Sequence, residues 1–327
     1  MLSEEMARIL VTGGAGFIGS SLIGALFRSD ENHKIIAYDN LSTGRLENIS
    51  DWQSQSNFDF IKADMLETGG LENAVNESDV VFHLAASSDV AIGEINTNID
   101  FEQNVVSTYR LLEAMKKSKE CKRIIFASTS TIYGEVMKDR LSENHSPLRP
   151  ISLYGSSKLA CESLISGYCH MFNMTGTIAR LANIIGPKSR QGVVYDFVSK
   201  LVSNPHRLEI LGNGKQNKSY LHVTDCVNAF VYLFKTPEEE NPAVYNVGSD
   251  DKITVSDISE ILIQELDLSS VERTYIDKHD GAGWTGDVRE FLLDSTKLKK
   301  LGWIPKYNSR EAIVLTVSDF LKSHELN

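Results

Sequence analysis

Tyr154 and Lys158 have the residue types and the spacing for joint proton chemistry. They lie four residues apart at the start of a helical pattern, so their side chains project from one face and can contact the same group. A free tyrosine has a pKa of about 10, and nearby positive charges favour its phenolate. Tyr154 is therefore a candidate general base. Such pairs also occur by chance on surface helices, so the reading depends on its surroundings.

A run of hydroxyl side chains precedes this pair. The segment 126–131 (Phe-Ala-Ser-Thr-Ser-Thr) ends an apolar stretch of strand type. Its hydroxyls could hydrogen-bond a substrate oxygen or the phenol of Tyr154. We expect Thr129 to be the first such group and Ser128 the second.

A nucleotide-binding βαβ unit at the N-terminus must position a reactant for these groups. Gly13, Gly16 and Gly19 follow an apolar strand and lead into a helical stretch. They allow a tight turn, a close approach to a pyrophosphate, and close packing of helix on strand. Asp39 ends the next strand at the distance expected for a contact with the adenosine ribose, and its charge would repel a 2′-phosphate. NAD is therefore expected over NADP.

The wider pattern predicts an α/β fold with a doubly wound parallel Rossmann sheet. Helices are expected over 18–28, 101–117 and 155–172. Residues 1–180 are expected to form the NAD-binding domain, and residues 181–327 mainly a smaller α/β substrate-binding lobe that partly interleaves with it. The ligand cleft should lie at the carboxyl ends of the strands. The strands are predicted at residues 8–12, 35–39, 58–62, 79–84, 123–128 and 176–181.

Bulk composition favours an ordinary globular protein. The 327 residues carry a net charge of −11, which disfavours nucleic-acid or acidic-membrane partners. We expect a cytoplasmic protein, because the sequence shows neither an apolar signal core nor a membrane-spanning run. The four cysteines are scattered, so buried reduced thiols are expected. No metal is expected, because His and acidic residues do not cluster at ligand spacings.

Several motifs together resemble the extended short-chain dehydrogenase/reductase family of NAD-dependent epimerases and dehydratases. Within that family, the chain is most similar to archaeal-type UDP-glucose 4-epimerases. The matching stretches follow the family's order over nearly the whole chain: residues 12–19 (TGGAGFIG), 83–86 (HLAA), 128–134 (STSTIYG), 154–158 (YGSSK), 180–187 (RLANIIGP), 220–225 (YLHVTD) and 301–305 (LGWIP).

The resemblance implies roles for the residues that match. Tyr154 is similar to the family's catalytic base, Lys158 to the lysine that binds the nicotinamide ribose, and Thr129 to the hydroxyl that orients the substrate. Asp64 matches an adenine-contacting aspartate, although it could equally cap a turn. The cofactor-binding set that the resemblance and the nucleotide motif imply is Gly13, Gly16, Phe17, Ile18, Gly19, Asp39, Asp64, Tyr154 and Lys158.

At the substrate end, Asn183 matches a residue that contacts the diphosphate, with helix or turn capping as its alternative. Asn104 matches an asparagine of the fourth helix, or could bridge helices. Phe291 resembles the position that limits sugar size in epimerases. The resemblance also implies a homodimer through the helices at 101–117 and 155–172.

The chain departs from the family where arginines usually grip the diphosphate. Lys218 stands at one such position and Trp284 near the other. A lysine can neutralise phosphate as a point charge but cannot form the bidentate fork. Lys188 and Arg190 are possible substitutes, or simply solvated loop charges.

Among the family's reactions, 4-epimerisation needs the least machinery. Dehydratases carry acidic residues within the hydroxyl motif and decarboxylases a glutamate, whereas this chain has Ser130 and Thr131 there. The preferred reaction is interconversion of UDP-glucose and UDP-galactose through a transient 4-keto sugar and NADH. Epimerisation of UDP-N-acetylglucosamine or UDP-glucuronate stays open. A nucleotide-sugar dehydratase or decarboxylase, or a non-catalytic NAD sensor, is a weaker alternative.

Overall fold

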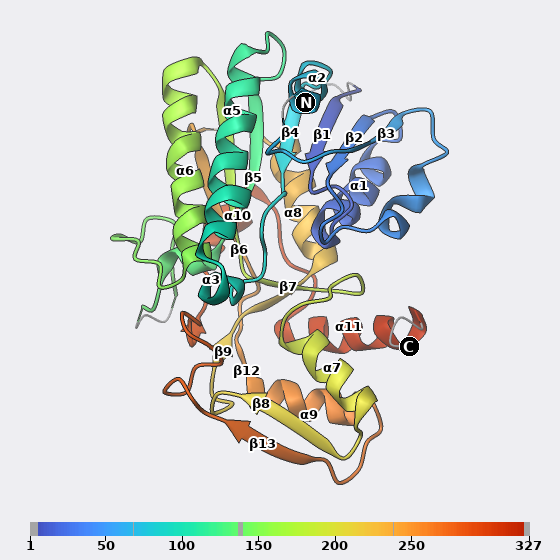
Figure 1. Cartoon of the computed structure of the whole chain (residues 1–327), viewed down its shortest axis with the longest axis vertical. Helices are drawn as coiled ribbons and strands as arrows, with labels where there is room; N and C mark the ends of the chain where they lie inside the picture. The colour runs from blue at the N-terminus through green and yellow to red at the C-terminus, as the bar shows by residue number, and fades with distance from the viewer. Residues whose placement is uncertain (1–5, 68, 137–139, 238, 324–327) are drawn as a thin grey trace.

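The computed structural model describes residues 6–67, 69–136, 140–237 and 239–323. It places a large parallel sheet in one lobe and three small sheets beside it in the second (Figure 1). The large sheet has seven strands in the order β11-β6-β5-β4-β1-β2-β3, all parallel. This confirms the predicted Rossmann class. Its strands are β1 (Arg8–Thr12), β2 (Lys34–Asp39), β3 (Phe58–Lys62), β4 (Val80–His83), β5 (Arg123–Thr129), β6 (Thr175–Leu181) and β11 (Ala243–Val247).

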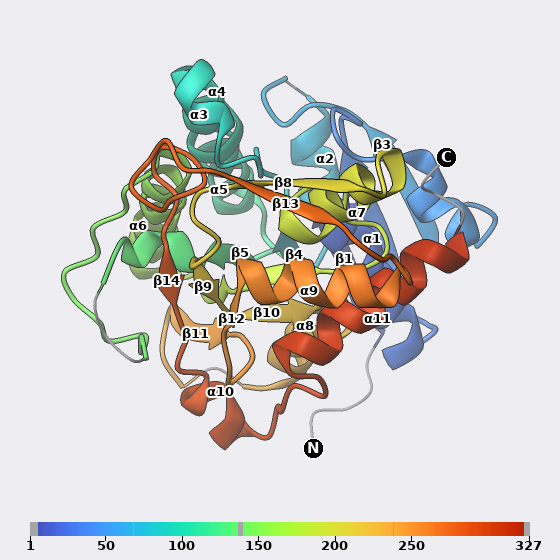
Figure 2. The same ribbon diagram turned by 90° about the horizontal axis from the view of Figure 1, so that it is seen from below.

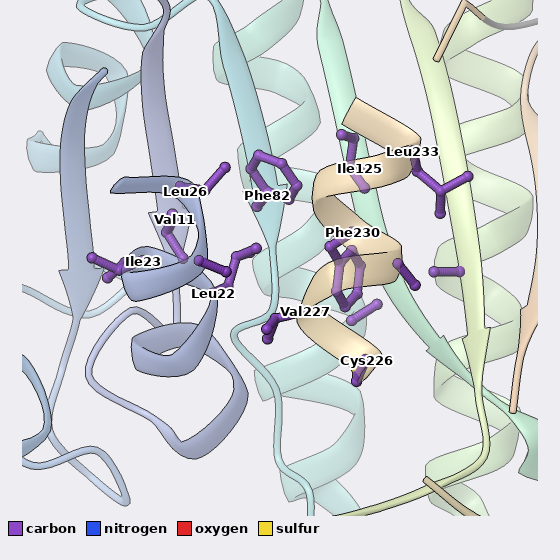
Figure 3. Packing of buried hydrophobic residues seen from close by; sticks show 14 of the residues in the cluster. Val11, Leu22, Ile23, Leu26, Phe82, Ile125, Cys226, Val227, Phe230 and Leu233 are labelled. Carbon is purple, nitrogen blue, oxygen red and sulfur yellow. The ribbon is translucent and has the colours of Figure 1, made fainter. Parts of the chain in front are cut away.

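Helices cover both faces of this sheet, because its strands are apolar on both sides. On one face α1 and α8 pack together through residues such as Leu22, Leu26 and Phe230, against Val11 and Phe82 of the strands (Figure 3). The other face is covered by α2, α5 and α6. The bounds are α1 (Phe17–Ser29), α2 (Gly70–Asn76), α5 (Ser107–Lys117), α6 (Leu153–Phe172) and α8 (Val223–Lys235), with η1 (Leu46–Trp52) and η3 (Ser130–Tyr133) as short 3₁₀ turns.

Two features of this lobe differ from the sequence expectation. The helix predicted over 101–117 begins as a π-helical segment, η2 (Phe101–Val106), preceded by short helices α3 (Ile92–Ile95) and α4 (Thr97–Asp100). The seventh strand, β11, comes from the later half of the chain, and α8 from the same half packs on α1. Residues of the later half thus take part in the first lobe, and β11 is a strand that the sequence did not predict.

The second lobe has its own core between α7, α9, α11 and the β8–β13 pair. Seen from below, β8 and β13 run beside each other, with α9 and α11 nearby (Figure 2). The three small sheets are β10-β7, β12-β9-β14 and β13-β8. The elements are β7 (Asn183–Ile185), α7 (Val193–Ser203), β8 (Arg207–Leu211), β9 (Asn217–Lys218), β10 (Tyr220–His222), β12 (Ile253–Thr254), α9 (Val255–Glu265), β13 (Glu272–Ile276), β14 (Glu290–Phe291), α10 (Thr296–Leu301) and α11 (Ser309–Ser323).

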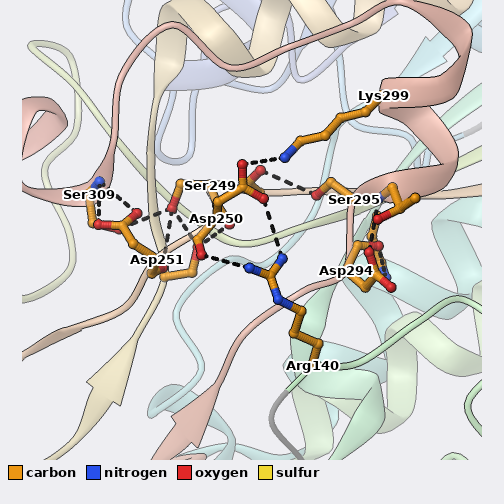
Figure 4. Close-up of polar contacts among 12 residues, drawn as sticks. Arg140, Ser249, Asp250, Asp251, Asp294, Ser295, Lys299 and Ser309 are labelled. Atoms are coloured by element: carbon orange, nitrogen blue, oxygen red, sulfur yellow. Dashed lines mark hydrogen bonds and ion pairs between the residues drawn. The ribbon is translucent and has the colours of Figure 1, made fainter.

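A polar junction joins the two lobes just after β11 (Figure 4). Asp251 accepts hydrogen bonds from the backbone and hydroxyl of Ser309 at the start of α11, both at 3.0 Å. Asp250 pairs with Arg140 and with Lys299 of α10. The chain thus leaves the large sheet through a turn whose carboxylates hold the two C-terminal helices in place.

None of the described helices is both long and apolar enough to span a membrane. Cys121, Cys161, Cys169 and Cys226 are all buried and are thiols rather than disulfides, as expected from the sequence.

Candidate active site

A single pocket of about 650 Å³ brings together the site residues predicted from sequence. It lies at the carboxyl ends of β1, β2 and β5 and extends into the second lobe. Every cofactor-side and substrate-side candidate except Asn104 lines it. These residues are Gly13, Gly16, Phe17, Ile18, Gly19, Asp39, Asp64, Ser128, Thr129, Tyr154, Lys158, Asn183, Lys188, Arg190, Lys218, Trp284 and Phe291.

The glycine loop packs so closely against neighbouring backbone that side chains at two of its positions would collide with it. Gly13 has φ +70°, and a Cβ on it would lie 2.8 Å from the backbone nitrogen of Ala85. A Cβ on Gly19 would lie 2.1 Å from the Gly13 carbonyl oxygen, so this helix–loop contact requires glycine. No side chain caps α1 at Gly16. The exposed amide end of that helix is the type of surface that binds phosphate.

Two aspartates stand at the ends of the neighbouring strands. Asp39 accepts hydrogen bonds from the backbone of Ala15 at 3.0 Å and of Leu41 at 2.8 Å, while burial raises its pKa. Asp64 accepts from Leu66 at 2.8 Å and from the Asn40 amide at 2.9 Å. Asp64 therefore does cap a turn, as its alternative reading held, and it also lines the pocket.

Tyr154 and Lys158 occupy the first turns of α6, which Ser152 caps by accepting from the Gly155 amide at 3.1 Å. Lys158 is only 3% exposed, and its ammonium donates to the Ala127 carbonyl at 2.9 Å. Burial lowers the pKa of Lys158 to about 8. The lysine Nζ is 6.0 Å from the centre of the Tyr154 ring.

The environment of the Tyr154 phenol differs from the sequence expectation. Burial and the nearby Asp100 carboxylate raise the pKa of Tyr154, and a hydrogen bond with Thr129 opposes this rise. In the protein alone, therefore, Lys158 does not bring the phenol toward working pH. The physical reason is desolvation, which disfavours the phenolate more than the distant ammonium favours it.

The two hydroxyls at the end of β5 point to different partners. Thr129 Oγ1 accepts from the Thr131 amide at 3.2 Å and belongs to the pocket wall beside Tyr154. Ser128 donates its hydroxyl to Glu162 Oε1 at 2.5 Å, within a buried polar cluster. The hydroxyl proton of Ser128 is thus engaged by a carboxylate, which leaves this pocket-lining hydroxyl only its acceptor capacity for a substrate.

At the substrate end, the lysine predicted from sequence comes with a counter-charge that was not predicted. Lys218 Nζ lies 2.5 Å from Asp287 Oδ1 and 5.5 Å from the centre of the Trp284 indole. The other oxygen of Asp287 accepts from the Gly283 amide at 3.0 Å. Asp287 is 5% exposed, so it ties the 283–287 loop to β9 from inside.

The remaining substrate-side candidates lie on adjoining short strands. Phe291 pairs in register with Lys218 and packs in a small apolar cluster with Ile132 and Tyr133, which follow the hydroxyl motif directly. Asn183 pairs with Tyr220. These contacts bring the second lobe against the end of β5.

Two candidates have other tasks in this structure. Lys188 donates to Asn48 at 2.9 Å and to Ser20 at 3.3 Å, which ties it to the cofactor-side lobe. Asn104 lies outside the pocket lining. It accepts from the Ser87 amide and donates to Ser157, both at 2.8 Å, so it bridges η2 and α6.

The fold, the glycine loop and the Tyr154–Lys158 pair define an enzyme of the extended short-chain dehydrogenase/reductase class. The chain belongs to the family described as GDP-mannose 4,6 dehydratase, which matches residues 10–316. Its relatives are named as nucleotide-sugar epimerases, dehydratases and decarboxylases, and solved structures of an epimerase and of a dehydratase among them contain NAD.

Three comparisons show the range. A Methanocaldococcus jannaschii protein, provisionally named a UDP-glucose 4-epimerase, is 32% identical and covers 95% of this chain and 97% of its own. The human dTDP-D-glucose 4,6-dehydratase is 30% identical and covers 95% and 89%. The structure of UDP-glucose 4-epimerase from Thermotoga maritima with UDP-glucose has a TM-score of 0.86 at 32% identity, covering 97% and 100%. The comparisons therefore establish the family, and both reaction types occur within it.

Proposed function

We propose that this protein is an NAD-dependent nucleotide-sugar 4-epimerase that interconverts UDP-glucose and UDP-galactose. The observation that carries the proposal is the makeup of the pocket wall around Tyr154. Thr129 and Thr131 lie beside this tyrosine, and the hydroxyl motif 128–131 contains no carboxylate. Eliminating water across two carbons needs an additional acid/base group, whereas epimerisation at one carbon needs only one.

The residues present fit NAD. Gly13 and Gly19 line the pocket in a loop so close to neighbouring backbone that a Cβ would collide with it, and the uncapped start of α1 adjoins this loop. Asp39 would hold the adenosine ribose, Asp64 the adenine end and Lys158 the nicotinamide ribose. When bound, NAD supplies a hydride acceptor for C4 of the sugar and a positive charge that favours the Tyr154 phenolate.

The chain's own groups then perform the proton chemistry. Tyr154 removes the proton of the C4 hydroxyl, while Thr129 holds the oxygen by hydrogen bonding. The substrate becomes a 4-keto sugar, which rotates in the pocket so that its opposite face is presented. With the hydride that bound NAD would hold and give back at C4, Tyr154 would return the proton to the C4 oxygen, so the cycle would consume nothing.

The substrate end favours a neutral, unsubstituted hexose. Phe291 is 5% exposed, lines the pocket and packs in a cluster with Ile132 and Tyr133, just after the hydroxyl motif, so we expect it to narrow the sugar end of the pocket. Lys218 would contact the diphosphate as a point charge, and Asn183 would donate to it. UDP-N-acetylglucosamine and UDP-glucuronate are alternatives. The second is supported by the structure of UDP-glucuronic acid 4-epimerase from Bacillus cereus with UDP-glucuronic acid and NAD, which is 27% identical to this chain and has a TM-score of 0.88.

The test is to incubate the purified protein, without added NAD, with UDP-galactose, UDP-N-acetylgalactosamine or UDP-glucuronate and to follow the sugar protons by NMR. We expect the C4 epimer to appear fastest from UDP-galactose. A faster reaction of either other substrate would correct the sugar assignment. Release of water or carbon dioxide, or no conversion even with NAD, would overturn the 4-epimerase proposal.

A homodimer through α5 and α6 is part of the proposal. Phe101 of η2, Tyr109 of α5 and Met171 of α6 are 56%, 48% and 71% exposed. Large exposed apolar side chains on paired helices favour a second copy as partner. Light scattering should give twice the chain mass, and a monomer mass would contradict this point.

A further inference from the structure

A buried ion pair lies directly beneath the proposed active site. Glu162 follows Lys158 by four residues on α6, so Tyr154, Lys158 and Glu162 share one face of the helix. Arg180 on β6 donates to Glu162 through Nε at 3.1 Å and through a terminal nitrogen at 2.8 Å. Glu162 is 6% exposed and Arg180 5%, so the pair is shielded from water.

This pair connects three elements that build the site. Ser128 and Arg180 are register neighbours on β5 and β6, and both side chains reach Glu162. The same arginine donates to the Tyr133 hydroxyl at 3.0 Å and to the Glu143 carbonyl at 3.1 Å. One carboxylate therefore fixes α6, the end of β5 and the segment after the hydroxyl motif relative to one another.

Successive residues at the end of β5 contact successive turns of α6. Lys158 binds the Ala127 carbonyl, Glu162 binds the Ser128 hydroxyl, and the next residue, Thr129, faces the pocket beside Tyr154. A shift of Glu162 would therefore move the strand end that carries Thr129 relative to the helix that carries Tyr154. Misplacement of about 1 Å can cost a reaction about a hundredfold.

Stability alone is a poor reason for this pair. Desolvating two charges costs free energy that their attraction barely returns, and well-packed apolar replacements are often neutral or stabilising. The presence of an ion pair here is explained better by the way it holds the neighbouring residues.

We propose that Glu162 is a positioning residue for the reaction. Through Ser128 and Arg180 it sets the carboxyl end of β5 against the helix that carries Tyr154 and Lys158, and it places a negative charge one helical turn from the Lys158 ammonium. The inference rests on the proposed function for its catalytic part, but its electrostatic part can be measured without substrate.

The charged and titratable groups around Lys158 determine whether its pKa rises or falls when the Glu162 charge is removed. Cys161 and Glu162 of α6 and Asp100 of α4 raise the pKa of Lys158 against the larger lowering by burial. Buried His83 on β4 is neutral at working pH, because burial lowers its pKa to about 3. Removing the Glu162 charge therefore lowers the pKa of Lys158 further.

The test compares the apolar double variant Glu162→Leu/Arg180→Met with the wild type. Ser163→Ala is the matched control, because Ser163 is an exposed residue of the same helix. We expect the double variant to fold, to lose about tenfold or more in kcat and to keep KM within about twofold. In protein labelled with 13C at the lysine ε-carbon, the Lys158 titration should move down by about half a pH unit.

A folded double variant with wild-type kcat and an unmoved Lys158 titration would overturn the proposal. If the double variant does not fold, Ser128→Ala decides instead, because it keeps the ion pair and removes only its link to β5. We expect its kcat to fall about three- to tenfold. A kcat equal to that of Ser163→Ala would refute the positioning role. If wild-type protein converts no nucleotide sugar, the proposed function fails, and the Lys158 titration still tests Glu162.

Discussion

The two walls of the pocket are built in different ways. The cofactor wall is made largely of backbone from one continuous stretch, the glycine loop and the start of α1, with Asp39 at the end of the next strand. The substrate wall is made of side chains from separated segments, above all the pair of Lys218 and Asp287. The close backbone packing of the cofactor wall restricts which residues can occupy it. The substrate wall, by contrast, can bind an anion with several different side chains.

This contrast explains why the chain keeps the family's glycines yet lacks its arginines. A Cβ at residue 19 would overlap the carbonyl of Gly13, so no other residue fits there. A diphosphate, by contrast, can be bound by a guanidinium fork, by an ammonium point charge or by an indole N–H. We infer that specificity within this fold changes more readily at the substrate wall.

The largest expected effect is at the tyrosine between the two walls. Tyr154→Phe removes the only proton carrier of the proposed reaction, and we expect kcat to fall about 1,000-fold. Turnover of UDP-galactose measured by NMR checks this. Tyr275→Phe is the control, because Tyr275 is exposed on β13. Normal turnover in Tyr154→Phe would refute the assignment of the base.

The cofactor wall should tolerate no added side chain. Gly19→Ala forces the loop away from α1, so we expect NAD affinity to fall at least about 100-fold, since phosphate contacts depend on loop placement. Titration of NAD by calorimetry measures it. Gly167→Ala adds the same methyl group on α6 where nothing lies within 4 Å, and it should bind NAD normally. Equal affinities for the two variants would contradict the requirement for glycine.

The same contrast decides what the sequence could predict. The six strands up to residue 181 and the pocket residues were predictable, because alternating apolar runs and the glycine spacing are local patterns. The seventh strand, β11, was missed because its pairing with β6 joins segments that are far apart in sequence, and no local pattern indicates such a pairing. Asp287 and Glu162 were missed because each acts through a partner that is distant in sequence, and no spacing rule connects them to it.

The substrate wall should respond in KM rather than kcat. Lys218→Ala removes a charged contact with the diphosphate, so we expect KM for UDP-galactose to rise about 10- to 100-fold with kcat nearly unchanged. Lys218→Arg should restore binding, because a guanidinium can serve the same anion. An unchanged KM in Lys218→Ala would show that the diphosphate is held elsewhere.

The smallest expected effect is the change of stability per pH unit. The pKa of Lys158 is lowered to about 8 in the folded protein from 10.5, so between these values the unfolded chain binds more protons. The free energy of unfolding should therefore gain about 1 kcal/mol per pH unit from this group between about pH 8 and 10.5. Urea unfolding of wild type and Lys158→Met at pH 8, 9 and 10 measures the difference. Parallel curves for the two proteins would contradict a buried lysine.

The central claim is that hydride leaves C4 of the sugar and returns to it within one pocket. The most direct test is to convert UDP-galactose carrying deuterium at C4 and to examine the product by NMR and mass spectrometry. The account predicts UDP-glucose that retains the deuterium at C4. Loss of the deuterium to solvent, or its appearance at another carbon, would contradict the 4-epimerase mechanism.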